Sequence, residues 1–285
     1  MSGLALCSLR SCGVTTTALG LTAALATAGP VVLAELDPHG GTLAARLGLA
    51  SDPGLVSLAA AARRRGGPEV VLEHTQALPH GGQVLLGPAT GAQTRAALAV
   101  AAGVLAHLDA LDVDVVADCG RVGDLGALAS SLPWADRVVV VCRPELSDLH
   151  ALASSLQAGP SWTDRLGLVL CGSGPYPAGE VSDAIGLAVI GHVPFDPDGA
   201  ILFAAPGPPA KSLWRTPFGR AVRSLVDQLA TSGTAGPYRT TGAAASQGAA
   251  PSPGTEDPDA ALGAPRTPDD DPYARIAGDR EPVAR

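Results

Sequence analysis

The sequence has almost no lysine: of its 19 basic residues, Lys211 is the single lysine and all the others are arginine. Any site in this chain that requires a lysine can therefore draw only on Lys211, and this includes the phosphate-binding loops that usually carry one. Lys211 follows much later in the chain, beside a predicted final helix, and is a poor replacement. Long apolar runs are also lacking, because Gly29-Pro30 interrupts the apolar segment 18–34. No transmembrane segment is predicted.

Several functional signatures are missing as well. The first turn has no G-x-G-x-x-G, which argues against a dinucleotide-binding domain, and no G-x-S-x-G elbow indicates a serine hydrolase. The five cysteines form no C-x-x-C pair, so we predict neither a zinc site nor a disulfide framework and interpret the thiols as core residues. No basic segment precedes the apolar stretch 17–28, as a secretion signal would require, so we expect a cytoplasmic protein.

The charge balance is acidic. The net charge is −8, of which −3 falls on residues 232–285 and −5 on residues 1–231. A dedicated nucleic-acid binder carries a basic footprint instead, so nucleic acid is an unlikely or weak partner. The one basic run, Arg63-Arg64-Arg65, is interpreted as the solvated last turn of a helix.

Short apolar segments rich in β-formers alternate with longer segments rich in alanine and leucine. Strands that are apolar throughout and alternate with helices are typical of a parallel sheet covered on both faces. The predicted fold class is therefore α/β, a doubly wound and mostly parallel sheet with helices on both faces. The strands are expected at 3–8, 30–35, 83–87, 113–118, 137–142, 166–171 and 188–193, and the helices at 15–28, 41–48, 54–65, 92–109, 146–157, 178–185 and 211–230.

Residues 1–231 are predicted to form one nucleotide-binding domain. Its last helix carries an apolar stripe that begins at Trp214 and ends at Leu229. Residues 232–285 are rich in Pro, Gly, Ala and Asp, with few large apolar side chains, and are predicted to be a disordered acidic tail.

A possible phosphate loop follows the first predicted strand and reads LRSCGVTTTAL, residues 9–19. Gly13 precedes a helix, so the backbone can curl until successive N–H groups point into one concavity beside the positive end of the helix dipole. The hydroxyls of Thr15, Thr16 and Thr17 then offer a helix cap and a ligand for phosphate-bound Mg²⁺. Such a turn alone is a weak signal.

Acidic residues end two further predicted strands. Strand 30–35 ends in ELDPHG, which places Glu35 and Asp37 at the strand tip, and strand 113–118 ends in Asp118. The carboxyl ends of parallel strands share one edge of the sheet, so these carboxylates are expected beside the first loop. Mg²⁺ prefers oxygen ligands of this kind.

These motifs, together with VPFDPD at 193–198, resemble the ParA/MinD family of deviant Walker-A P-loop ATPases, which partition chromosomes and plasmids or position intracellular machinery. The order and spacing match over residues 3–230. The resemblance implies ATP or ADP with Mg²⁺ as the cofactor. It implies phosphate contacts at Gly13, Val14, Thr15 and Thr16, and an adenine border near Pro194 and Asp196.

The resemblance also implies a magnesium side of the site. Thr15 would be a metal ligand, Asp37 the catalytic switch aspartate near the metal, and Asp118 the acidic residue that holds the metal through water. A protein partner or a second copy of the chain is the implied partner.

The sequence departs from the family at both lysines: Val14 stands in the position of one, and the position of the other is Leu9 or lies beside Arg10. Those cations stabilise charge that develops during phosphoryl transfer, so hydrolysis should be slow or absent. Three functions remain open: a nucleotide-binding switch, a nucleotide-independent interaction module, and an active ATPase in which Arg10 is the substitute cation.

Overall fold

The computed structural model describes residues 3–156, 163–205 and 212–232. Within these ranges the chain forms an eight-stranded sheet with the order β3-β4-β2-β5-β1-β6-β7-β8. All neighbouring strands are parallel except β3, which pairs antiparallel with β4. The strands are β1 (Gly3–Ser8), β2 (Val31–Glu35), β3 (Gln76–Ala77), β4 (Gln83–Leu85), β5 (Asp114–Arg121), β6 (Arg137–Cys142), β7 (Leu166–Cys171) and β8 (Val189–Val193).

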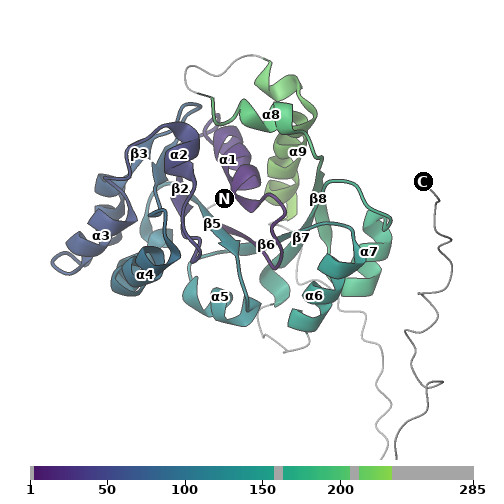
Figure 1. Cartoon of the computed structure of the whole chain (residues 1–285), viewed down its shortest axis with the longest axis horizontal. Helices are drawn as coiled ribbons and strands as arrows, with labels where there is room; N and C mark the ends of the chain where they lie inside the picture. Colours follow the sequence, from purple (N-terminus) through teal and green to yellow (C-terminus); the bar gives the residue numbers. More distant parts are fainter. Residues whose placement is uncertain (1–2, 157–162, 206–211, 233–285) are drawn as a thin grey trace, which may run out of the picture. The chain divides into compact units, whose positions relative to one another are not determined.

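Helices cover both faces of the sheet, as Figure 1 shows. The α-helices are α1 (Val14–Leu25), α2 (Leu43–Leu47), α3 (Leu55–Ala62), α4 (Gly91–Leu105), α5 (Leu125–Ser131), α6 (Leu146–Leu156), α7 (Ala178–Ile185), α8 (Pro197–Ile201) and α9 (Pro217–Ser232). Short 3-10 turns are η1 (Pro68–His74), η2 (Leu108–Ala110), η3 (Thr163–Arg165) and η4 (Leu213–Arg215). The predicted doubly wound α/β class is confirmed.

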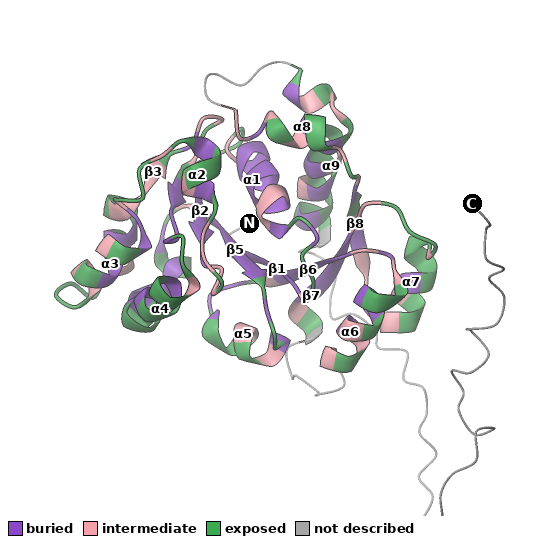
Figure 2. Cartoon of the chain, in the orientation of Figure 1, coloured by how far each residue is buried: buried purple, intermediate pink, exposed green. Residues whose placement is uncertain are grey.

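Figure 2 shows most of the central strands as buried, between helices on both sides. The buried apolar residues form two clusters on opposite faces of the sheet. Alternate residues of β1 join different clusters: Ala5 and Cys7 pack with α3 to α7, whereas Leu4 and Leu6 pack with α1, α2 and α9. The period of two is that of a strand buried on both faces. Asp118 lies two residues after Val116, which faces α1, so the strand period turns its side chain toward the start of α1.

The seven predicted strands are all present, and the largest differences from prediction are local. β3, α5 and α8 were not predicted, because each is short and lacks a clear period. The predicted helix 211–230 begins only at Pro217, since Thr216 is extended and the ring of Pro217 suits a first helical turn. Trp214 therefore belongs to η4 rather than to the apolar stripe of the last helix. Its ring packs edge to face on Phe203, with centroids 5.5 Å apart.

Other predictions fall outside these ranges. Lys211 and the tail from residue 233 onward are not among the described residues. No helix in the described ranges combines the length and apolar character needed to cross a membrane.

Candidate functional site

The loop between β1 and α1 ends in the backbone conformation expected for a phosphate loop. Gly13 has φ of +94° and ψ of 25°, a left-handed conformation that favours glycine, and it precedes the first residue of α1. No side chain caps this helix end. The first backbone N–H groups of a helix have no partner inside it, so those of α1 remain available to an anion.

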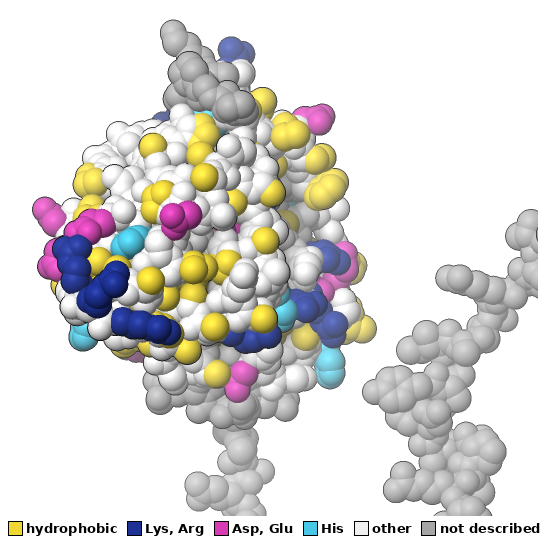
Figure 3. Space-filling model, turned by 60° about the vertical axis from the view of Figure 1, so that its left-hand side comes forward, with side chains coloured by type: hydrophobic (Ala, Val, Ile, Leu, Met, Phe, Trp, Pro, Cys, Tyr) yellow, Lys and Arg dark blue, Asp and Glu magenta, His cyan; other side chains and the backbone are white. Residues whose placement is uncertain are grey.

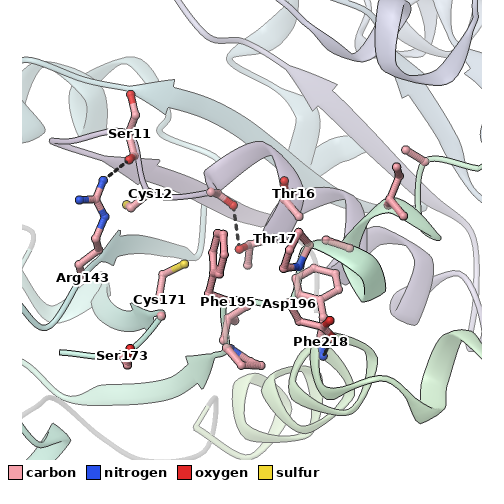
Figure 4. Close-up of a pocket in the computed structure, with 18 of the residues that line it drawn as sticks. Ser11, Cys12, Thr16, Thr17, Arg143, Cys171, Ser173, Phe195, Asp196 and Phe218 are labelled. Atoms are coloured by element: carbon pink, nitrogen blue, oxygen red, sulfur yellow. Dashed lines mark hydrogen bonds between the residues drawn. The ribbon is translucent and has the colours of Figure 1, made fainter.

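A pocket of about 870 Å³ opens beside this loop (Figure 4). Ser11, Cys12 and Gly13 of the loop and Thr16 and Thr17 of α1 form one side. Residues that follow β7 and β8 form the other, among them Phe195 and Asp196. Phe195 is 84% exposed although it lines the pocket, so a large apolar ring is open to a ligand. A volume of this size fits a nucleotide-sized molecule.

Some of the predicted phosphate and base contacts line this pocket, and others do not. Gly13, Thr16, Pro194 and Asp196 line the pocket. Val14 and Thr15 do not. The Val14 side chain is buried among the apolar residues between the sheet and α1, and the Thr15 side chain contacts Asp118 instead.

The Asp196 carboxylate is committed to the fold itself. It accepts hydrogen bonds from the backbone N–H of Gly199 at 3.0 Å and from that of Phe218 at 2.9 Å. Asp196 thus fixes the starts of α8 and α9 at the pocket rim, and its two oxygens are already used.

Asp118 is a buried carboxylate with an incomplete set of partners. One oxygen, Oδ1, accepts a hydrogen bond of 3.0 Å from the backbone N–H of Gly120. The other, Oδ2, is buried and finds no hydrogen-bond partner among the residues that the structure describes. Burial raises the pKa of Asp118 to about 6, although the Thr15 side chain and the Gly120 N–H favour the charged form. A buried oxygen without a partner beside a hydroxyl fits a hard divalent cation.

Asp37 lies close to Asp118 across the backbone of Gly120. A Cβ added at Gly120, whose φ is +56°, would collide with the Asp37 carboxylate. Asp37 Oδ1 accepts a hydrogen bond of 2.8 Å from the backbone N–H of His39 and lies 3.2 Å from His39 Nδ1. The two aspartates and Thr15 therefore gather at one edge of the sheet, as the strand ends predicted.

Glu35 has a different role from its neighbour Asp37. Its buried carboxylate accepts three backbone N–H bonds, at 2.6 Å from Thr42, 2.9 Å from Leu43 and 2.9 Å from Gly87. Burial raises the pKa of Glu35, while these bonds act in the opposite direction. The side chain holds the start of α2 and the loop after β4 in place.

Arg10, the predicted substitute cation, is exposed and is not among the residues that line the pocket. Two arginines that the sequence did not indicate line the pocket: Arg46 on α2 and Arg143 directly after β6. Arg143 directly follows a predicted strand. The carboxyl ends of parallel strands share one edge of the sheet, so the reasoning applied to Asp118 also applies to Arg143. Arg46 lies within a helix and carries no comparable sequence signal.

The cysteines are largely core residues, as predicted. Cys7, Cys119 and Cys142 are buried, and the Cys12 thiol donates a hydrogen bond of 2.9 Å to the Val141 carbonyl oxygen. Burial, aided by the nearby Cys171, raises the pKa of Cys12 to about 12, so it stays a neutral thiol. Within the described residues no group of His, Cys, Asp and Glu side chains is arranged to hold a metal through three or more ligands.

Charge on the outer surface is mixed. Arg63, Arg64 and Arg65 are exposed at the end of α3, and Arg65 forms an ion pair of 2.5 Å with Glu73. Figure 3 shows acidic and basic side chains together on the face that it turns forward.

No protein-family profile and no curated protein matches this sequence, but solved structures share its fold. A ParA family ATPase from Chlorobium tepidum TLS has a TM-score of 0.64 at 17% identity, covering 80% of this chain and 99% of that one. The septum site-determining protein MinD of Pyrococcus horikoshii OT3, solved with Mg-ADP, has a TM-score of 0.62 at 20% identity, covering 81% and 98%. MinD in the MinC:MinD complex of Aquifex aeolicus has a TM-score of 0.60 at 16% identity, covering 84% and 98%. This chain has the fold of the ParA and MinD ATPases.

Proposed function

We propose that this protein is a nucleotide-binding switch of the ParA/MinD type that binds ATP or ADP with Mg²⁺ and hydrolyses ATP slowly or not at all. The observation that carries the proposal is the 870 Å³ pocket at the uncapped start of α1, with the orphaned oxygen of Asp118 close to the first turn of that helix. The pocket at the start of α1 suits phosphates, and the carboxylates beside that helix start, which do not line the pocket, suit the metal that accompanies them.

The residues of this chain divide the work between them. The N–H groups at the start of α1 bind phosphate oxygens, while the exposed ring of Phe195 offers a face on which a base can stack. Thr15, Asp118 and Asp37 would hold Mg²⁺, which neutralises phosphate charge when bound. The proposal also gives Asp37 the role of orienting a water molecule, and the contact of its loop with the end of β5 is consistent with that role.

The structural basis for slow hydrolysis is the apolar character of both lysine positions. Val14 is buried and Leu9 is partly buried against the opposite core cluster. A cation that completes a phosphoryl-transfer site changes the rate by orders of magnitude, so its loss should reduce turnover much more than binding.

Calorimetric titration of Mg-ATP and Mg-ADP into the purified protein tests the proposal. We expect saturable binding that weakens when Thr15→Val removes the hydroxyl, and that weakens when Mg²⁺ is chelated. Thr27→Val is the matched control, because Thr27 lies beyond the other end of α1. Absence of heat and of any thermal shift at millimolar nucleotide would refute the proposal.

The switch needs a recipient for its signal, and we propose a protein partner or a second copy of the chain. The MinD structure solved with MinC is a precedent for a protein partner on this fold. The alternative is an interaction module that works without nucleotide. It predicts that Asp37→Ala and Asp118→Ala leave partner binding intact, whereas a switch would lose nucleotide control of that binding.

The third possibility, an active ATPase that depends on Arg10, receives less support because Arg10 lies outside the pocket lining. Steady phosphate release by the unmodified protein, abolished in the Arg10→Ala variant, would support an Arg10-dependent ATPase.

A further inference from the structure

We infer that Arg46 and Arg143 take over the phosphate-binding role of the missing lysines, while hydrolysis stays slow as proposed above, by binding the phosphate groups of a nucleoside di- or triphosphate from two sides of the loop. The inference rests on the proposed nucleotide site and names the source of its positive charge. Three features of the structure support it: the orientation of the former lysine positions, the anchoring of each arginine, and the placement of both around the loop.

The loop itself cannot supply a cation to the pocket from its two lysine positions. The Val14 side chain packs between the sheet and α1, and Leu9 packs toward the cluster on the other face of the sheet. Neither residue lines the pocket. A phosphate at the start of α1 therefore requires charge from other elements.

Arg46 reaches the loop from α2. Its Nη2 donates a hydrogen bond of 3.1 Å to the hydroxyl of Thr16, in the first turn of α1, and both residues line the pocket. The position of α2 is not incidental, because the buried Glu35 carboxylate binds the N–H groups of Thr42 and Leu43 at its start. The guanidinium carries five N–H donors, so one bond to Thr16 leaves donors for a ligand.

Arg143 reaches the loop from the opposite end. Its Nη2 donates a hydrogen bond of 2.7 Å to the carbonyl oxygen of Ser11, as Figure 4 shows, and its Nη1 lies 3.7 Å from Glu145 Oε2. The buried Asp148 carboxylate accepts a bond of 3.1 Å from the Arg143 backbone N–H and fixes the turn after β6. Arg143 lines the pocket, and its guanidinium has further N–H donors besides the one bonded to Ser11.

The two contacts bracket the phosphate loop. One arginine holds Ser11 before Gly13, the other holds Thr16 after it, and the uncapped N–H groups of α1 lie between them. One guanidinium group can bind two phosphate oxygens at once. Two guanidinium groups on separate elements therefore match a ligand with more than one phosphate. The exposed Phe195 ring in the same pocket favours a nucleotide over inorganic polyphosphate.

The test compares Mg-ADP affinity in five charge-removing variants. We expect Arg46→Gln and Arg143→Gln each to weaken binding about tenfold, the size of one charge-assisted hydrogen bond, and the double variant about a hundredfold. Arg64→Gln is the matched control, because this exposed arginine ends α3 and does not line the pocket. Arg10→Gln tests the rival cation.

Two further readouts separate binding from structural support. Adenosine lacks phosphates, so its affinity should be the same in all variants, and thermal unfolding midpoints should stay within a few degrees of the unmodified protein. Arg46→Lys and Arg143→Lys, which keep a point charge but lose the planar fork, should recover part of the affinity.

The outcomes distinguish failure of this inference from failure of the proposed nucleotide-binding function. Unchanged Mg-ADP affinity in both Arg46→Gln and Arg143→Gln overturns this inference and leaves the nucleotide-binding function standing. A loss confined to Arg10→Gln overturns it in favour of Arg10. Failure of the unmodified protein to bind Mg-ADP at millimolar concentration overturns both the function and the inference.

Discussion

Replacing Asp118 with asparagine should stabilise the metal-free protein at neutral pH. The carboxylate is buried on β5, one of its oxygens has no partner among the described residues, and Glu35 and Asp37 add negative charge nearby. Ionisation is therefore unfavourable in the folded state. Asparagine has the shape of the neutral acid, so its amide avoids this cost.

The size of the effect follows from the pKa of Asp118, which burial raises from 3.8 to about 6. Because the folded protein holds this proton more tightly than the unfolded chain, the contribution of Asp118 is fully favourable below about pH 4 and is lost as the pH rises through 6. A shift of roughly two pH units corresponds to about 3 kcal/mol. Asp118→Asn should thus match the unmodified protein near pH 4 and exceed its free energy of unfolding by about 3 kcal/mol at pH 7.5.

Urea denaturation of both proteins between pH 4 and 7.5, with chelator present, measures this difference. Asp109→Asn, at an exposed aspartate of η2, controls for loss of a surface carboxylate. The reasoning fails if Asp118→Asn is less stable at pH 7.5, or if the two stabilities differ by the same amount at every pH. Added Mg-ADP should reverse the order, because only the carboxylate can bind the cation.

Three more predictions concern the frame of the site. Glu35→Gln places an amide N–H₂ against a backbone N–H and should lower the free energy of unfolding by about 2 kcal/mol in urea denaturation; an unchanged value would contradict the role given to this carboxylate. Gly120→Ala should displace Asp37 and reduce the gain in nucleotide affinity that Mg²⁺ provides by about tenfold or more. Calorimetry measures this gain, and Gly29→Ala, where no atom lies near the added Cβ, is the control that should leave it unchanged. Equal effects of the two substitutions would refute the contact between Gly120 and Asp37. Phe203→Ala removes a fully buried ring that packs on two other aromatic rings, and thermal denaturation should show a loss of about 3–5 kcal/mol; a loss below about 1 kcal/mol would contradict that packing.

The regular part of the fold could be predicted from sequence because its strands are strongly apolar and its helices are long. The strands at 3–8, 137–142 and 166–171 coincide with β1, β6 and β7. Short elements could not be predicted in this way, since two residues of β3 or five of α8 display no period. Trp214 fitted a helical stripe by spacing, but the extended Thr216 before Pro217 separates it from α9.

The proximity of two aspartates could also be predicted from the sequence. Asp37 follows β2 and Asp118 lies in β5, which pairs with β2 in parallel, and the structure brings the two side chains close together across Gly120. Glu35 and Asp37 looked alike as a carboxylate pair in the sequence. Only the three N–H groups around Glu35 distinguish a carboxylate that holds a turn from one that faces the site.

The sequence by itself determined the fold class and the edge of the sheet where Asp37 and Asp118 lie, because hydrophobic period and the succession of strands and helices along the chain are properties of the sequence. It also established that the segment between β1 and α1 contains no lysine. Tertiary structure alone decided where positive charge stands near that loop, because Arg46 and Arg143 come from different elements and meet the loop only after the sheet has formed. Arg10 is close to the loop in the sequence, but in the structure Arg46 and Arg143 line the pocket and Arg10 does not.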